Sequence, residues 1–365
     1  MDKLEQARLQ INAIDKQMAE LFVKRMEASA QVGAYKVEHG LPVLDTAREA
    51  EVIRRNSTMV EDETLRAYYV NFLQNNMALS RKYQQRIQQG LTVAYSGVEG
   101  AFAFIAARKI FPDAVQQSYG DFRSAYDAVV KGDCDCAVLP IENSYEGEVS
   151  QVIDLLFQGT LYVNGIYDLE ITQNLLGLPG ATVEGIKTVV SHPQALGQCA
   201  GYIRDHGFEA IRANNTAIAA QQVAEKGDLS VAAIASEDTA ALYGLKILEK
   251  IINESSTNTT RFAVFSRVEN RAETVNHGRQ SILVFTVKNE AGALARAINI
   301  IGDHGFNMRT LRSRPMKELM WQYYFYVEAD GNAHSAAGKQ MMQELSACCD
   351  HLRVVGTFAH ETSLK

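Results

Sequence analysis

A group of small hydrogen-bonding side chains stands beside a single cation in the stretch ESSTNTTRFAVF, residues 254–265. Every residue from 255 to 260 has a hydroxyl or an amide, and Arg261, Phe262 and a strand-like apolar run follow. A solvated loop accounts for this composition, because these residue types favour turns. A site that holds a small anion and hydrogen-bonds a leaving oxygen also accounts for it. Both interpretations stay open at this point.

Cations interrupt an apolar stripe near the start of the chain. Arg8 falls within the stripe, Arg25 follows its last member by four residues, and Lys36 follows Val32 by four. The stripe has helical spacing and consists of Leu4, Ile11, Ile14, Met18 and Leu21. A buried charge is costly unless it is paired. Internal salt bridges, extension of the charged ends to the stripe edge, or an anionic ligand would each satisfy these cations.

More polar residues share faces of the helices that follow. Asp45, Arg48 and Glu49 are spaced to lie on one helix face, and Ser80 and Gln84 are one helical turn apart. Because the fork of an arginine matches a carboxylate in two hydrogen bonds, a compact dicarboxylate would satisfy such a cluster.

Residues 4–86 resemble the all-helical chorismate mutase family, through the segments QARLQINAID, LFVKRMEAS, QVGAYK and PVLDTAREAEV and the pair Ser80 and Gln84. The resemblance implies rearrangement of chorismate to prephenate by orientation and electrostatic preorganisation, without nucleophile or cofactor. It implies carboxylate clamps at Arg8, Arg25 and Arg48, donors to the ether oxygen at Lys36 and Gln84, an acceptor of the ring hydroxyl at Glu49, and substrate contacts at Asp45 and Ser80. It also implies that the long helices pair in a dimer and that Arg8 crosses to the partner's site.

Polar runs also follow strand-like segments in the middle of the chain. The segment AVLPIENSYEG places Glu142, Asn143 and Ser144 after one strand, and VVSHPQALGQC places Ser191 and His192 after another. Strand ends and helix N-termini are where α/β sheets bind anions. Ordinary turn chemistry is the alternative for each loop taken singly.

Residues from about 91 to 267 resemble prephenate dehydratase, through PIENS, SHPQALGQC, NNTAIAA and TRF. The resemblance makes Thr260 the central catalytic group, which hydrogen-bonds or protonates the departing ring hydroxyl while CO2 leaves. It implies further substrate-site residues: Glu142, Asn143, Ser144, Ser191, Gln198, Arg261 and Phe262. A loop-bracing role for Arg261 and a packing role for Phe262 remain open. Ala101 and Ala103 stand where the family commonly has hydroxyls, which leaves a substrate contact by that loop open.

Three segments with different patterns must position these residues. Residues 1–90 read as all helix, with one helix of some 35 residues, about 50 Å long, which a small domain cannot cover without a partner chain. Residues 91–268 alternate strands and helices, which predicts a doubly wound, mostly parallel α/β fold with two lobes. A polar linker spans 269–280. Residues 279–360 read as βαββαβ, the ferredoxin-like order.

The C-terminal segment resembles an ACT regulatory domain, through AGALARAINII at 291–301 and the SRP tripeptide. The resemblance implies that phenylalanine binds between two such domains, at Gly292, Ala293, Leu294, Ser313, Arg314 and Pro315. Arg312, the residue just before this tripeptide, stands where family members usually have Glu. A purely structural dimerisation domain is the alternative.

Composition limits the partners. The 365 residues include 36 Lys and Arg against 43 Asp and Glu, a net charge of −7, which argues against nucleic acid or an anionic membrane. No apolar run approaches the roughly 20 residues of a membrane span, and the N-terminus lacks a signal core. The five cysteines fit reduced thiols in a cytoplasmic protein, and the eight histidines lack metal-ligand spacing. We therefore expect no metal and no cofactor.

The leading hypothesis is a cytoplasmic bifunctional enzyme, a homodimer or homotetramer, that converts chorismate to phenylpyruvate and is inhibited by L-phenylalanine. Two alternatives belong to other classes: a non-enzymatic solute-binding module, and a dehydratase whose helical segment only dimerises or senses. A preference for arogenate over prephenate is a narrower alternative.

Overall fold

The computed structural model describes residues 2–255, 257–270, 279–316, 322–359 and 362–364. The chain divides into two compact units, Met1–Thr92 and Val93–Lys365, and each is described by itself. The predicted linker at 269–280 lies mostly outside the described residues.

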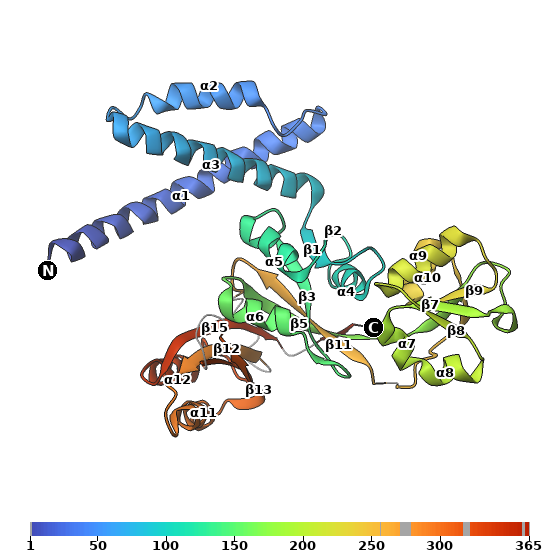
Figure 1. Ribbon diagram of the computed structural model, residues 1–365. Helices are drawn as coiled ribbons and strands as arrows, with labels where there is room; N and C mark the ends of the chain where they lie inside the picture. Colours follow the sequence, from blue (N-terminus) through green and yellow to red (C-terminus); the bar gives the residue numbers. More distant parts are fainter. Residues whose placement is uncertain (1, 256, 271–278, 317–321, 360–361, 365) are drawn as a thin grey trace. The chain divides into compact units, whose positions relative to one another are not determined.

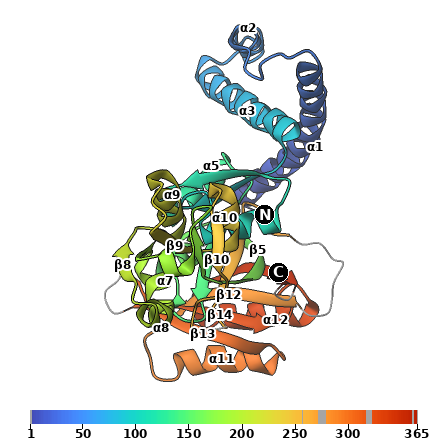
Figure 2. The ribbon, with the colours of Figure 1, turned by 90° about the vertical axis from the view of Figure 1, so that its right-hand side faces the viewer.

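The first unit consists of helices, as predicted (Figures 1 and 2). Their bounds are Lys3–Glu38 for α1, Thr46–Ser57 for α2 and Glu63–Gln89 for α3. Each begins at an aspartate, Asp2, Asp45 or Asp62, whose carboxylate accepts a hydrogen bond from the backbone N–H three residues later. Gly90, with φ of 82°, ends α3. Helix α3 runs across the C-terminal half of α1 (Figure 1), and the Cβ of any residue replacing Gly33 would lie 3.1 Å from Cγ of Gln84.

The apolar stripe of α1 is exposed in the single chain. Leu4, Ile11, Ile14 and Leu21 are between 54% and 63% exposed. Only Ser29 and Gly33 of this 36-residue helix are buried. A stripe of this kind needs a partner surface, because exposed contiguous apolar patches mark interaction sites.

The second unit begins with a seven-stranded sheet in the order β16-β5-β11-β3-β1-β2, in which β4 also pairs with β3. Its strands are β1 (Thr92–Ser96), β2 (Val115–Tyr119), β3 (Cys136–Asn143), β4 (Gly147–Glu148), β5 (Tyr162–Glu170), β11 (Thr259–Ser266) and β16 (Thr362–Leu364). The helices along this part of the chain are α4 (Phe102–Ile110), α5 (Phe122–Lys131) and α6 (Ser150–Gln158).

A five-stranded sheet in the order β10-β6-β9-β7-β8 forms the second lobe. Its strands are β6 (Asn174–Gly177), β7 (Thr188–Ser191), β8 (Glu209–Arg212), β9 (Val231–Ala235) and β10 (Lys246–Glu249). The helices are α7 (Pro193–Gln198), α8 (Ala200–Asp205), α9 (Thr216–Lys226) and α10 (Glu237–Tyr243), with a 3₁₀ turn at Val183–Gly185. Helices α7 and α8 cover one face and α9 and α10 the other (Figure 1).

The expectation of a mostly parallel sheet is wrong, because both sheets are mixed. The chain leaves the first sheet after β5 and returns as β11, which runs antiparallel to both β3 and β5. In the second sheet β6 is antiparallel to β9 and β10. Helices α7 and α8 follow β7 directly and meet at Cys199.

The C-terminal part has the order βαββαβ and a four-stranded antiparallel sheet, β13-β14-β12-β15. Its elements are β12 (Arg279–Val287), α11 (Ala293–Asp303), β13 (Asn307–Pro315), β14 (Tyr323–Asp330), α12 (Ala336–Ser346) and β15 (Cys349–Ala359). Because successive side chains of a strand point to opposite faces, Leu283 and Phe285 pack under the two helices while Ile282 and Val284 join the core around α6. Strand β13 lies at the edge of this sheet.

The described residues contain neither a membrane-spanning helix nor a group of side chains suited to a metal ion. No helix there is long and apolar enough to cross a membrane. No group of three or more His, Cys, Asp or Glu side chains is placed to hold a metal ion.

Candidate active sites

The helical unit contains a cavity of about 300 Å³ that brings together most of the residues predicted to bind chorismate. All three helices contribute to its wall: Arg25, Ala28, Ser29, Val32, Lys36, Val43, Asp45, Arg48, Glu49, Val52, Met77, Ser80, Arg81 and Gln84. Arg8 is exposed on α1 and does not line the cavity of its own chain.

Arg25 and Ser80 join α1 to α3 at this cavity. Nη1 of Arg25 donates to Oγ of Ser80 and, at 3.3 Å, to the carbonyl of Asn76. Burial lowers the pKa of the Arg25 guanidinium. A partly buried cation that donates here to a hydroxyl and a carbonyl is suited to an anionic ligand.

Gln84 and Lys36 place polar groups at the same cavity. Nε2 of Gln84 donates to Oγ of Ser29 at 3.0 Å, and its buried Oε1 has no hydrogen-bond partner among the described residues. Nζ of Lys36 donates to the carbonyl of Val43 at 2.6 Å. The hydroxyl of Ser29 can donate or accept, so the Gln84 amide turned by 180° keeps this bond and places Nε2 where the unpaired Oε1 now lies.

Arg81 is a cavity residue that sequence reasoning missed. Its guanidinium pairs with Glu49, from α2, and their side chains are 30% and 27% exposed. The two residues are 32 positions apart, so no local spacing predicts the pair. Arg48, by contrast, pairs with Glu51 at 2.7 Å at the exposed side of α2.

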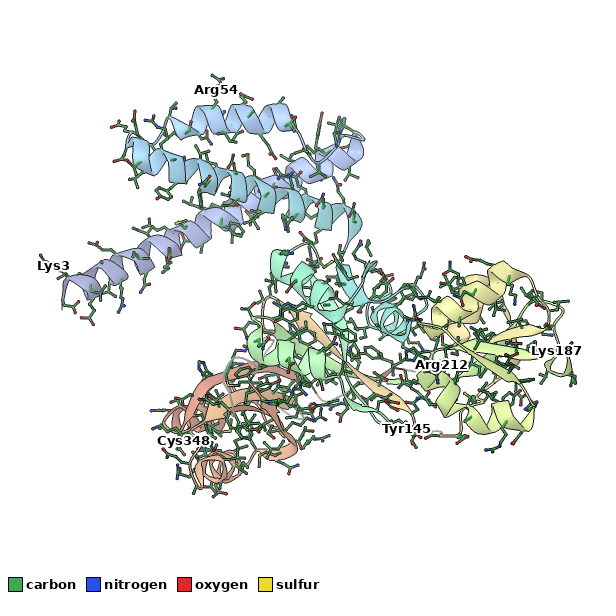
Figure 3. The ribbon with its side chains drawn as sticks, viewed as in Figure 1. Lys3, Arg54, Tyr145, Lys187, Arg212 and Cys348 are labelled. Atoms are coloured by element: carbon green, nitrogen blue, oxygen red, sulfur yellow. The ribbon has the colours of Figure 1, made fainter. Side chains whose placement is uncertain are left out.

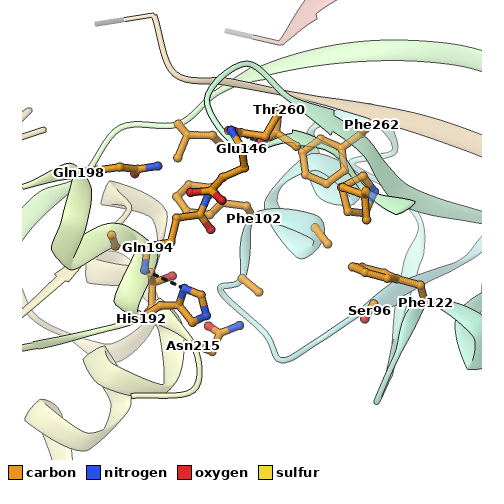
Figure 4. A pocket seen from close by; sticks show the side chains of 18 of the residues that line it. Ser96, Phe102, Phe122, Glu146, His192, Gln194, Gln198, Asn215, Thr260 and Phe262 are labelled. Atoms are coloured by element: carbon orange, nitrogen blue, oxygen red, sulfur yellow. Dashed lines mark hydrogen bonds between the residues drawn. The ribbon is translucent and has the colours of Figure 1, made fainter. Parts of the chain in front are cut away.

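The α/β unit contains a cavity of about 390 Å³ walled by both lobes (Figure 4). Thr260, Phe262 and Asn143 line it from the first lobe, and Gln198 lines it from the second. Thr260 pairs with Asn143 across β11 and β3. Because strand residues alternate between faces, Thr260 and Phe262 face the cavity together.

The hydroxyl of Thr260 is held by an amide. Nδ2 of Asn143 donates to Oγ1 of Thr260 and to Oδ1 of Asn258, each at 2.9 Å. Oδ1 of Asn143 accepts from the backbone N–H groups of Tyr145 and Glu146, also at 2.9 Å. Since Oγ1 accepts from Asn143, the hydroxyl proton of Thr260 remains available to donate to a bound molecule.

Four residues predicted from the dehydratase resemblance do not line this cavity. Ser191 is fully buried and donates to the carbonyl of Ile234 at 2.5 Å. Ser144 bridges the loop before β11 by donating to the carbonyl of Thr257 and accepting from the N–H of Thr259. These two hydroxyls therefore brace strands and loops.

Glu142 and Arg261 are the other two, and they pair with each other at 3.2 Å. They neighbour Asn143 and Thr260 in the strands, so alternation turns them to the opposite face. Arg261 also donates to the buried carboxylate of Glu328, at 2.9 and 3.2 Å. The geometry favours the bracing role of Arg261 that the sequence left open.

The cavity also includes residues that belong to the sequence motifs above but were given no role there. His192, which caps α7, and Gln194 belong to the SHPQALGQC motif (Figure 4). Asn215, from NNTAIAA, caps α9. Ala101 and Ala103 also form part of the wall, so this segment reaches the cavity with methyl groups instead of hydroxyls.

Of the residues predicted to bind phenylalanine, only Leu294 lines the cavity that the described residues form beside α11. Gly292, with φ of 79°, begins α11, and Ala293 is buried. Leu294 lines a cavity of about 640 Å³ together with Met316 and Tyr323. The predicted residues of β13, Ser313, Arg314 and Pro315, do not line it. Arg314 instead contacts Asp154 and Glu148.

These features define two candidate active sites of an enzyme, one in the helical unit and one in the α/β unit, and each region matches a known enzyme family. The sequence profile of Chorismate mutase type II matches residues 7–85, and that of Prephenate dehydratase matches residues 93–270. The chain is 30% identical to the bifunctional chorismate mutase/prephenate dehydratase of Neisseria gonorrhoeae, over 95% of this chain and 94% of the relative. It is 29% identical to that of Escherichia coli K12, over 97% and 95%.

The chain belongs to the bifunctional chorismate mutase/prephenate dehydratase family, and it has both activities of phenylalanine biosynthesis. Among solved structures it is similar to the Arthrobacter aurescens prephenate dehydratase in complex with L-Phe, with 26% identity and a TM-score of 0.68, covering 74% of this chain and 90% of that one. A structure described as a quorum quenching acylase, GqqA, has 29% identity and a TM-score of 0.69, covering 74% and 98%. Membership in this family excludes two alternative hypotheses: a non-enzymatic solute-binding module, and a dehydratase whose helical segment only dimerises or senses.

Proposed function

We propose that the helical cavity binds chorismate by its two carboxylates and holds it in the reactive chair. Arg25 and Arg48 clamp the carboxylates, Lys36 and the turned amide of Gln84 donate to the breaking ether oxygen, and Glu49 accepts the ring hydroxyl. Asp45 and Ser80 fix this arrangement, the first as the cap of α2 and the second as the partner of Arg25. The observation that supports it most is the gathering of these residues at one cavity. The rearrangement needs orientation and charge stabilisation only.

The mutase works as a homodimer in this proposal. The exposed stripe of α1 packs against a second copy, and Arg8 reaches the partner's cavity. The full chain with Ile14→Asp tests this, since a charge in the stripe would weaken the contact. We expect loss of mutase activity at low protein concentration while dehydration of added prephenate continues. Mutase activity that stays independent of concentration in this variant would contradict the dimer.

The dehydratase cavity acts on prephenate through Thr260. The bond to the ring carboxylate breaks, CO2 departs, and the electron pair of that bond enters the ring. The ring hydroxyl leaves as water with a proton passed to it by the Thr260 hydroxyl, which takes up a proton from solvent in turn. Aromatisation drives the step, so the protein supplies position and a hydrogen-bond donor to the leaving oxygen. The supporting observation is that Asn143 occupies an acceptor position of the Thr260 hydroxyl, whose proton is free to serve. Gln198 and Phe262 shape the substrate's surroundings.

The C-terminal sheet is proposed to be an ACT domain that binds L-phenylalanine between two copies. The Leu294 cavity and the exposed edge strand β13 supply the two half-sites. The complex of a similar dehydratase with L-Phe supports this ligand.

One experiment tests the three proposals together. Purified protein is incubated with chorismate, with and without L-phenylalanine, and chorismate, prephenate and phenylpyruvate are followed over time. We expect phenylpyruvate to form and phenylalanine to suppress it. Phenylpyruvate formation indifferent to phenylalanine would contradict the regulatory proposal alone. Parallel assays with arogenate decide which substrate the second site prefers.

A further inference from the structure

Two arginines of the C-terminal edge strand reach across to the dehydratase lobe. Nη2 of Arg312 donates to Glu142, and its Nη1 lies 3.8 Å from Oε2 of Glu148. Arg314 donates to the other oxygen of Glu148 and, through Nε at 2.8 Å, to Asp154 on α6. These contacts join β13 to the lobe that contains Thr260.

The two glutamates face each other across a hairpin. Glu142 of β3 pairs with Glu148 of β4, and Asn143 pairs with Gly147. Like charges directly opposite each other destabilise a strand pair. Arg312 contacts both glutamates and offsets this repulsion, together with Arg261, which pairs with Glu142, and Arg314, which pairs with Glu148.

This hairpin forms part of the dehydratase cavity. Asn143, Glu146, Gly147 and Glu148 all line it. Asn143 holds the hydroxyl of Thr260, and its own orientation depends on the N–H of Glu146 in the hairpin turn. A displaced turn therefore releases Asn143 and leaves Thr260 without its partner.

The contacts lie in a partly buried environment. The side chain of Arg312 is 19% exposed, that of Glu142 26% and that of Glu148 29%. Ion pairs that are shielded from water and form a network contribute more than isolated surface pairs, which contribute little. Glu142 also accepts from Arg261, so the carboxylate sits between two guanidiniums.

We propose that Arg312 is a positioning residue of the dehydratase: by bridging Glu142 and Glu148 it closes the β3–β4 hairpin and holds Asn143 against Thr260. The inference rests on the proposed role of Thr260. It gives a function to the residue that departs from the usual Glu in this strand.

The test uses the full chain with Arg312→Met. We expect kcat for prephenate to fall about tenfold with little change in KM, because misplacement of the reacting groups costs rate more than binding. The mutase activity of the same preparation serves as an internal control and should be unchanged. Arg309→Met is a matched control, because Arg309 lies on the same strand and pairs with Asp330, away from the hairpin. It should behave like the parent.

A second substitution separates positioning from general stability. Adding Glu142→Gln to Arg312→Met removes one of the two facing charges, so the double variant should be more active than Arg312→Met alone. Arg312→Lys should retain part of the activity, since it keeps the charge. Unchanged kcat in Arg312→Met, or failure of Glu142→Gln to restore activity, would overturn the inference. If Arg312→Met does not fold, as judged by its thermal unfolding, Arg312→Lys compared with Arg312→Gln decides the same point.

Thr260→Val, assayed alongside, separates the two proposals. An inactive Thr260→Val with a parent-like Arg312→Met leaves the role of Thr260 standing and removes that of Arg312. An active Thr260→Val removes the proposed role of Thr260 itself.

Discussion

The two cavities obtain their polar groups in different ways. The helical cavity collects its residues from helix faces, and the long helix that supplies Arg25 and Lys36 has most of its apolar stripe exposed. The α/β cavity is walled by two lobes of one chain, and its central hydroxyl lies on a strand inside a seven-stranded sheet. We therefore expect the first site to depend on the proposed assembly with a second copy, and the second site to depend on the network around its strands.

The largest expected effect concerns the α/β site. Thr260→Val keeps the shape of the side chain and removes its hydroxyl, so the departing oxygen loses its donor. We expect prephenate dehydration to fall by about 10²–10⁴-fold, the range typical of general acid catalysis. The mutase activity should be unchanged. Equal losses of both activities would mean that the change disturbs the whole chain.

Lys36→Met is the corresponding test of the helical site. The ammonium that is proposed to stabilise the ether oxygen disappears, while the aliphatic part of the side chain is retained. Mutase kcat should fall about 10²–10³-fold, as for loss of one preorganised donor. Steady-state assays with chorismate and, separately, with prephenate check it. A dehydratase that weakened in parallel would show that the two sites are coupled.

Arg81→Met should have a moderate effect. Glu49 would lose its partner on α3, so its carboxylate would no longer be fixed for the ring hydroxyl. Since hydrogen bonds to charged groups are worth about 1.5–3 kcal/mol, we expect mutase activity to fall roughly 10-fold or more. Arg54→Met is the control, because Arg54 is exposed on α2 (Figure 3). Parent-like kinetics for Arg81→Met would remove Arg81 from the site.

The smallest expected effect comes from Gly33→Ala. The added methyl group would lie 3.1 Å from Cγ of Gln84, closer than ordinary contact, so the glutamine side chain must shift. We expect a few-fold loss of mutase kcat with unchanged thermal stability of the second unit. A gain in mutase activity would show that Gln84 acts from a different position.

Much of the fold followed from local patterns. The long N-terminal helix was predicted from its stripe, and strands such as β3 and β7 were predicted from short apolar runs. The relative direction of the strands was not predicted correctly, because strands in parallel and antiparallel pairs have the same local pattern of hydrophobic residues. Strand β5 was missed, since it mixes buried and half-buried positions and has no continuous apolar run.

For the sites, the sequence by itself determined the families and predicted residues such as Arg25, Lys36 and Thr260, since these lie in motifs whose spacing is local. Only the tertiary structure decided which neighbours face a cavity. Strand alternation turns Asn143 and Thr260 toward the substrate site and Glu142 and Arg261 away from it. The tertiary structure also decided the long-range pairs, Arg81 with Glu49 and Arg312 with Glu142, because contacts between residues far apart in the chain have no local signature.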